Sequence, residues 1–148
     1  MKPSEIRTEL IAQHEAVRSM ARRTGELVAR MKSGEAVRVG LGKALGELAD
    51  AMRAHNEREE ALLREIIPTV DAWGPARAAV MLEQHRLEHH ELHAAVLGAR
   101  DESSDAITAD SVEALLASIV KHMEREEEAF LSEEVLRDDN VSIYYFGG

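Results

Sequence analysis

Four stretches of the chain carry apolar residues at alternating spacings of three and four, the pattern of a helix with one buried face. Ser33-Gly34 ends the first stretch and Pro68 stops the second, while Thr108 and Asp110 are both suitable N-caps for the fourth. The predicted helices span about Pro3–Lys32, Ala36–Ile67, Pro75–Arg100 and Thr108–Arg137. Valine and isoleucine never alternate with polar residues as they would in a strand, so the pattern predicts an all-α protein.

Short connections between long helices favour antiparallel neighbours. The polar segment Asp101 to Asp105, for example, leaves little chain between the third and fourth helices. We therefore expect an up-down-up-down antiparallel four-helix bundle. It would form one domain over residues 1–137, followed by a short C-terminal tail over residues 138–148.

Charge and composition argue against several classes of partner and cofactor. The 148 residues carry a formal net charge of −10, and no lysine or arginine cluster is long enough to follow a phosphate backbone, so we expect no nucleic-acid partner. No apolar run approaches the roughly 20 residues of a membrane span, and no secretory signal is evident near Met1. These features predict a cytoplasmic protein without a membrane partner. The absence of cysteine excludes thiolate zinc sites and iron–sulfur clusters.

Each predicted apolar seam is interrupted by side chains that commonly bind metals. The second seam, for instance, runs through Leu48 and Met52 to His55 and Glu59 before returning to Leu62. The interrupting residues on the four helices are His14; His55 and Glu59; His85 and His89; and His122 and Glu126. Burying a lone carboxylate or imidazole costs several kcal/mol unless it is paired or bound to a cation. Seven such residues on four seams therefore predict a buried polar site.

The depths of these residues along the helices agree. In an antiparallel bundle, the start of the first helix lies beside the end of the second, the start of the third and the end of the fourth. Counted from that shared end, all seven residues lie roughly 12–22 Å deep at the helical rise of about 1.5 Å per residue. We therefore expect a single layer to contain all seven side chains.

Five imidazoles and two carboxylates suit borderline first-row ions such as iron or manganese, and zinc accepts the same ligand types. Two carboxylates for two ions would imply that each carboxylate bridges. A metal-free network of carboxylate–histidine pairs is the alternative explanation. A ferritin-like centre is disfavoured, because it uses Glu-x-x-His pairs and no histidine here has a glutamate three residues before it.

The set His14, His55-Asn56-Glu57-Arg58-Glu59, His85-x-x-x-His89 and His122-x-x-x-Glu126 resembles the hemerythrin family, including its bacterial HHE cation-binding relatives. The resemblance implies two non-haem iron ions with an oxo or hydroxo bridge, and reversible binding of dioxygen at one of them. By position, His85, His89 and His122 would ligate the coordinatively saturated iron. His14 and His55 would ligate the other iron, and Glu59 and Glu126 would bridge the two.

One departure from the family concerns the last carboxylate. In animal hemerythrins it is an aspartate five residues after its histidine, whereas here Glu126 lies four residues and Glu127 five residues after His122. The seam favours Glu126, a spacing common among the HHE relatives. Because those relatives include sensors and oxidative enzymes, the ligand could be dioxygen, another small diatomic molecule or peroxide. An enzyme acting on peroxide, nitric oxide or ferrous iron and an iron- or oxygen-responsive regulatory module are the alternatives.

Several neighbouring residues are assigned other roles. His90 and His93 lie off the seam and are expected at the surface, and Met52, Met81 and Met123 are expected to fill the core around the site. Acidic residues beside the ligands are expected on the outer face, where any could accept a hydrogen bond from a ligand imidazole: Glu57, Glu60, Glu124 and Glu128. Trp73 is expected to cap the core. The apolar tail is expected to fold back onto the bundle or to contact a protein partner.

Overall fold

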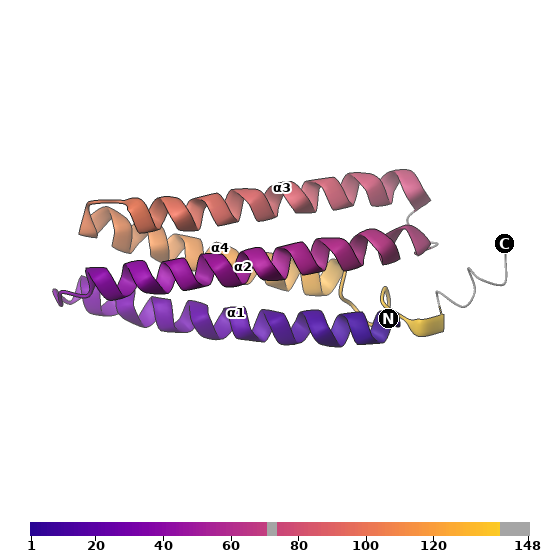
Figure 1. The fold of residues 1–148 in the computed structure, drawn as a ribbon, viewed down its shortest axis with the longest axis horizontal. Helices are drawn as coiled ribbons and strands as arrows, with labels where there is room; N and C mark the ends of the chain where they lie inside the picture. The colour runs from indigo at the N-terminus through magenta and orange to yellow at the C-terminus, as the bar shows by residue number, and fades with distance from the viewer. Residues whose placement is uncertain (71–73, 140–148) are drawn as a thin grey trace.

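The computed structural model describes residues 1–70 and 74–139, and this part of the chain is helical without strands. Its elements are α1 (Pro3–Lys32), α2 (Arg38–Ile66), the 3₁₀ helix η1 (Ile67–Thr69), α3 (Gly74–Asp101) and α4 (Asp105–Ala129). The four long helices alternate in direction, and each packs against its neighbours in the chain, with α1 also packing against α4 (Figure 1). The all-α class and the four-helix bundle are therefore confirmed. The predicted roles of Trp73 and of the tail from residue 140 lie outside the described residues.

Most helix boundaries lie at or near the proline and glycine residues of the sequence. Helix α1 has the predicted bounds, with Pro3 in its first turn, where the missing N–H costs no hydrogen bond. Helix α2 begins two residues later than predicted, at Arg38, and η1 carries the chain through Pro68. At the start of α3, Gly74 has a φ of +71°, a conformation that glycine adopts more easily than other residues.

Helix α4 differs from the prediction at both ends. It begins at Asp105, and Thr108 lies inside it, where both the backbone N–H and the hydroxyl of Thr108 donate to the carbonyl of Ser104. A hydroxyl bonded back to the preceding turn cannot cap a helix. The helix ends at Ala129 rather than near Arg137, because the N–H groups of Phe130 and Leu131 share the Glu126 carbonyl and the chain turns.

The segment after α4 covers the end of the bundle. Leu131 and Leu136 are buried, and the carboxylate of Asp138 accepts hydrogen bonds from the backbone N–H and the hydroxyl of Ser4. This segment therefore connects the end of the described chain to the start of α1. Ala129, the last residue of α4, is exposed.

The hydrophobic core consists of two clusters with a polar layer between them. The terminal cluster lies at the end of the bundle where the chain begins and comprises Ile6, Leu10, Leu62, Leu63, Ile66, Ile67, Ala78, Phe130, Leu131 and Leu136. The distal cluster fills the other end and includes Val17, Ala21, Val28, Leu41, Leu45, Leu48, Met52, Val96, Val112, Ile119 and Met123. Each buried leucine contributes about 1.5–3 kcal/mol. The two clusters thus hold the four helices together on both sides of the polar layer.

None of the helices in the described ranges combines the length and the apolar character needed to cross a membrane.

Candidate metal centre

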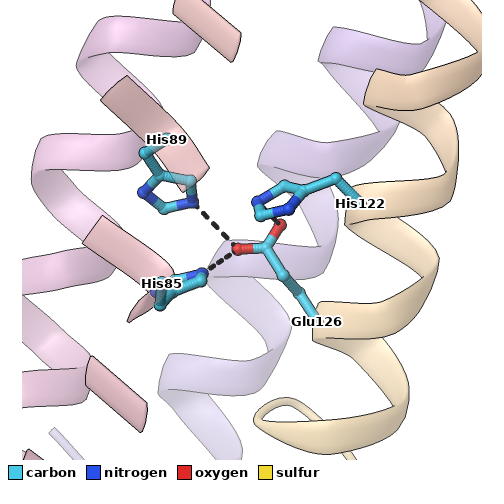
Figure 2. Close-up of side chains that lie close together, drawn as sticks. All are labelled: His85, His89, His122 and Glu126. Carbon is cyan, nitrogen blue, oxygen red and sulfur yellow. Dashed lines mark hydrogen bonds and ion pairs between the residues drawn. The ribbon is translucent and has the colours of Figure 1, made fainter. Parts of the chain in front are cut away.

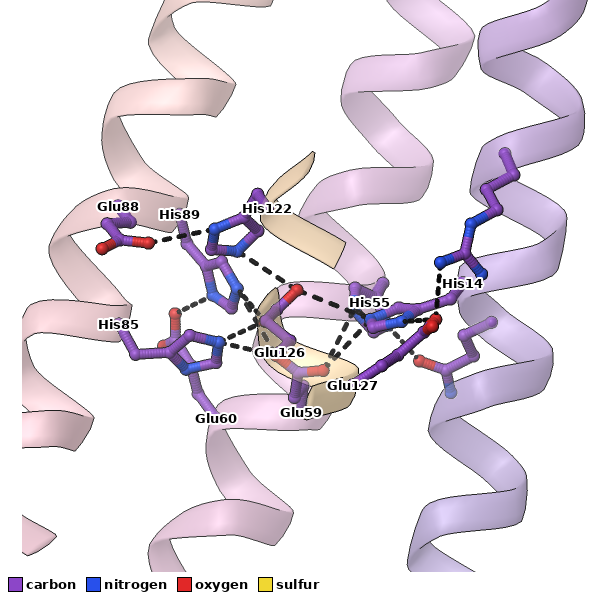
Figure 3. A network of polar contacts seen from close by, with 12 residues as sticks. His14, His55, Glu59, Glu60, His85, Glu88, His89, His122, Glu126 and Glu127 are labelled. Carbon is purple, nitrogen blue, oxygen red and sulfur yellow. Dashed lines mark hydrogen bonds and ion pairs between the residues drawn. The ribbon is translucent and has the colours of Figure 1, made fainter. Parts of the chain in front are cut away.

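The polar layer contains all seven residues that interrupt the predicted seams. None of their side chains is more than 7% exposed, and His14 and Glu59 are fully buried. Within α2 and α4 the histidine and the carboxylate are four residues apart, as are the two histidines of α3, which places each pair on one helix face. The seven side chains converge from four helices onto one small volume (Figure 3).

Two groups of potential ligand atoms share this volume. The three-histidine group comprises His85, His89, His122 and Glu126, and their ligand atoms lie within 4.8 Å of one another (Figure 2). The two-histidine group comprises His14, His55, Glu59 and Glu126, within the same limit. Glu126 belongs to both groups, so one carboxylate faces both potential metal positions.

Glu59 also lies between the two groups. Its Oε2 is 3.4 Å from the Nε2 atoms of both His14 and His55. Its Oε1 is 2.9 Å from Nε2 of His85 and 3.5 Å from Nε2 of His89. The carboxylate therefore presents one oxygen to each group.

Glu126 is arranged in a similar way. Its Oε2 accepts hydrogen bonds from His85 and from His89, the latter at 3.0 Å. Its Oε1 lies 3.2 Å from Nε2 of His122 and 3.6 Å from Nε2 of His14. Glu127, the alternative bridging residue, instead faces away from the centre of the layer, where it accepts a hydrogen bond from His14 and pairs with Arg18.

A ring of hydrogen bonds supports four of the histidines from outside. In each case Nδ1 donates to a residue of the preceding helix around the bundle: His55 to Gln13 at 2.7 Å, His89 to Glu60 at 2.9 Å, His122 to Glu88 at 3.0 Å and His14 to Glu127 at 2.9 Å. Every acceptor directly precedes or follows a residue of the polar layer in the chain. The ring fixes the orientation of each imidazole and leaves its Nε2 facing inward.

This orientation places hydrogen-bond acceptors against one another, and a cation between them would balance their negative charge. Because His14 and His55 both donate through Nδ1, their neutral rings direct two Nε2 lone pairs at each other over 3.1 Å. The same two atoms face the Glu59 carboxylate. Such an arrangement needs a proton or a metal ion between the acceptors. The donor set and its geometry therefore fit a metal ion.

Other inward-facing atoms are also left without hydrogen bonds. Within the described part of the chain, both oxygens of Glu59, Oε1 of Glu126 and Nε2 of His122 are buried and have no hydrogen-bond partner. These are the atoms that a cation in the layer would contact. Nδ1 of His85 is also buried without a partner, and it is the one outward ring nitrogen in the described layer that the ring of acceptors does not serve.

The pKa values indicate that charge is held in the layer. Burial disfavours the charged imidazole, but the facing carboxylates of Glu126 and Glu59 outweigh it and raise the pKa of His85 to about 9 and that of His89 to about 10. The pKa of His14 is raised in the same way. Burial would raise the pKa of Glu59, but the close approach of the Glu126 carboxyl group and of the facing imidazoles holds that pKa well below the usual range. In the absence of metal, protons therefore occupy the positions where a cation fits.

A cavity of about 210 Å³ opens between α3 and α4 and reaches the three-histidine group. His85, His122 and Glu126 form part of its lining, together with Met81, Gln84 and Phe130. The cavity gives a small molecule a path to one side of the layer.

The residues around the layer mostly have the predicted environments. His90 is exposed, His93 is half-buried, and Met52 and Met123 are buried while Met81 is half-buried. Of the acidic residues predicted to accept from a ligand imidazole, Glu60 does so, whereas Glu57, Glu124 and Glu128 are exposed. The acceptor roles of Gln13, Glu88 and Glu127 were not predicted. Their position next to a layer residue in the chain is the sequence signal that could have identified them.

Comparison with known proteins agrees with this arrangement. A family model described as the hemerythrin HHE cation binding domain matches residues 5–133, a stretch that contains all seven residues of the layer. No curated protein matches the chain, and no solved structure does.

Proposed function

Since the chain belongs to the hemerythrin HHE cation-binding domain family, we propose that its polar layer holds two non-haem iron ions and that the protein binds dioxygen there. The observation that carries the proposal is the position of Glu59 and Glu126, which each present oxygens to both groups of histidines. A carboxylate shared in this way can neutralise and bridge two cations.

The proposed ligands follow the two groups. His85, His89 and His122 would hold one iron, and His14 and His55 would hold the other. Glu59 and Glu126 would bridge them, with an oxo or hydroxo group as the further bridge that the family implies. When bound, two ferrous ions supply the two electrons that reversible binding of dioxygen requires. The protein contributes the orientation of each imidazole through the outer ring of acceptors and an apolar enclosure that limits water.

The first test is metal content. Full-length protein purified from iron-supplemented cells is expected to contain about two irons per chain by elemental analysis. The His90→Ala variant is a matched control, because His90 is an exposed histidine adjacent to His89 on the same helix. A wild-type protein that retains no iron, or that binds zinc in preference when both are offered, would refute the iron assignment.

The second test addresses dioxygen. Anaerobic ferrous protein exposed to oxygen is expected to develop a visible charge-transfer band that disappears on removal of oxygen and returns on re-exposure. Repeated cycling with unchanged amplitude would support reversible binding. Irreversible bleaching in the first cycle would contradict it.

Peroxide decomposition is a second candidate, and the cavity between α3 and α4 favours it. Gln84, Glu88 and Arg125 give this cavity polar side chains beside the three-histidine group, so peroxide and proton donors could reach the layer. Addition of hydrogen peroxide to the iron-loaded protein, followed with an oxygen electrode, separates the two functions. Sustained oxygen evolution supports catalysis, whereas a single stoichiometric change supports binding.

A further inference from the structure

The outer acceptors of the three-histidine half are negatively charged. His89 donates to Glu60 and His122 donates to Glu88, and both acceptors are carboxylates (Figure 3). In the described part of the chain, neither carboxylate forms an ion pair with a lysine or an arginine. Their negative charge therefore acts directly on two of the three imidazoles that would hold one metal ion.

The outer acceptors of the two-histidine half are closer to neutral. His55 donates to the side-chain oxygen of Gln13, which carries no charge. His14 donates to Oε1 of Glu127, and the Arg18 guanidinium lies 2.7 Å from the same oxygen. The charge of the one carboxylate on this side is thus offset at the atom that accepts from the imidazole.

Arg18 acts mainly on Glu127, although it has a second partner. Its other terminal nitrogen lies 2.8 Å from the carboxylate of Glu15, which is 62% exposed, whereas Glu127 is 26% exposed. Water and salt screen an exposed pair more strongly than a half-buried one. The contact between Arg18 and Glu127 is therefore the stronger of the two.

This difference in charge determines which ion each position favours. A carboxylate that accepts from Nδ1–H makes the imidazole a more basic ligand at Nε2, and its negative charge favours an ion of higher charge. A neutral amide or a carboxylate paired with a cation does so less. Glu59 and Glu126 face both groups of histidines, so they do not distinguish the two positions.

We propose that the outer acceptors make the two metal positions unequal, so that the three-histidine position favours a trivalent ion and the two-histidine position a divalent ion. This inference rests on the proposed metal centre and adds to it which position stabilises the ferric state. The position with fewer protein ligands is then also the one that favours the ferrous ion.

Gallium(III) and zinc(II) are suitable probes, because they have the charges of ferric and ferrous iron and do not change oxidation state. Metal-free full-length protein is equilibrated with one equivalent of each ion as its citrate complex and crystallised. Anomalous diffraction on both sides of each absorption edge locates the two elements. Gallium is expected beside His85, His89 and His122, and zinc beside His14 and His55. The expected preference is about tenfold, because the additional charge of gallium interacts with two carboxylates across one imidazole each.

The double variant Glu60→Gln/Glu88→Gln removes both charges but keeps an oxygen that can accept from each imidazole. It is expected to bring the distribution of gallium and zinc close to equal. The matched control is Glu57→Gln/Glu124→Gln, which removes two exposed carboxylates from the same region of α2 and from α4. It should leave the distribution as in wild-type protein.

Arg18→Gln changes the other half of the layer and keeps every proposed ligand and outer acceptor. Loss of the guanidinium leaves the charge of Glu127 unpaired, so the preference is expected to fall a few-fold. Arg22→Gln removes an exposed cation one helical turn later on α1 and should have no such effect.

The outcomes separate this inference from the metal centre. If two ions bind but gallium and zinc occupy both positions equally in wild-type protein, the inference is refuted and the metal centre stands. A preference that persists in both Glu60→Gln/Glu88→Gln and Arg18→Gln would also refute it, because the outer acceptors would not be its cause. Fewer than two ions per chain in wild-type protein would overturn the metal centre and this inference with it.

Discussion

The two halves of the polar layer use the same ligand types but differ in their surroundings. In the two-histidine half, the outer acceptor Glu127 is 26% exposed and is itself held by Arg18. In the three-histidine half, the acceptor Glu88 is 52% exposed and the cavity between α3 and α4 reaches the ligands. Ligand identity therefore does not set accessibility. The residues around the ligands determine how accessible the ligands are to solvent, and they make the three-histidine half the more open of the two.

This difference bears on the family resemblance. The resemblance puts the free coordination position on the iron held by His14 and His55, whereas the cavity borders His85 and His122. A small molecule that enters between α3 and α4 would meet the three-histidine half first. The predictions below test whether the two halves are as unequal as their surroundings.

The largest effect is expected from the carboxylate that faces both halves. Glu59→Ala should reduce the metal content from about two ions per chain to nearly none, because its oxygens face both groups of histidines. His55→Ala and His89→Ala should each leave about one ion, retained in the intact half. Elemental analysis of the three purified variants provides the measurement. Full metal content in Glu59→Ala would contradict the bridging role.

The next effect concerns pH. The pKa of His85 is raised to about 9 and that of His89 to about 10, so in metal-free protein at neutral pH both rings hold protons that an ion must displace. Metal affinity of the three-histidine half should therefore rise with pH up to about 10, by about tenfold per unit for each displaced proton. Chelator competition at several pH values, together with measured proton release, checks this. An affinity that does not change with pH would be contrary evidence.

The same pKa shifts determine how the stability of the metal-free protein changes with pH. Because both folded-state pKa values lie above the ordinary value of 6.5, protonated His85 and His89 stabilise the fold fully below about pH 6.5. That contribution should be lost as the pH rises through about 9 to 10. Urea unfolding of the metal-free protein across this range measures the loss, and zinc-loaded protein is the control.

A smaller effect is expected from the outer acceptors. Glu60→Ala should weaken metal binding at the three-histidine half by about 10- to 100-fold, because Glu60 orients His89. Glu88→Ala should have a weaker effect, since the more exposed Glu88 can be replaced by water. Glu124→Ala is the matched control, because Glu124 is exposed and its replacement also removes one negative charge. Equal losses in all three variants would indicate a general charge effect instead of orientation.

The smallest effect concerns access of small molecules to the polar layer. Ala129→Phe should partly fill the cavity and slow removal of metal by a chelator a few-fold, with the equilibrium affinity nearly unchanged. Ala12→Phe, on the exposed side of α1 near Gln13, should leave the rate as in wild-type protein. Stopped-flow chelation measures both rates. A slower rate in Ala12→Phe alone would place the entry route on the two-histidine half.

The fold and the position of the polar layer were predictable because they depend on periodic burial. A stripe of apolar residues determines which face of a helix is inward, and Pro68 and Gly34 mark helix ends through backbone geometry alone. The ends of α4 were not predictable in this way. Thr108 is a residue type that often caps helices, but its hydroxyl donates to the carbonyl of Ser104 inside α4. At the other end, the carbonyl of Glu126 ends the helix by accepting hydrogen bonds from two N–H groups.

The outer ring was only partly predictable, for a different reason. Gln13, Glu88 and Glu127 are polar residues next to a seam, and periodicity alone describes them as surface. Their roles depend on the rotation of each helix relative to the next, which brings a flanking residue of one helix against the imidazole of its neighbour. Adjacency to a layer residue in the chain narrows the candidates, but spacing within a helix does not say which of them that rotation brings against an imidazole.

The division of the core into two clusters has a consequence for how the molecule unfolds. With the charges of the layer balanced by bound ions, we expect both clusters to form one cooperative unit, because opening either end would also break the layer. Once the ions leave, the layer loses their contacts and its buried polar atoms remain in the middle of the bundle, so we expect the terminal cluster to open more easily while the distal cluster stays folded. Loss of metal would thereby make one end of the chain sensitive to proteases, and metal supply would determine the lifetime of the protein.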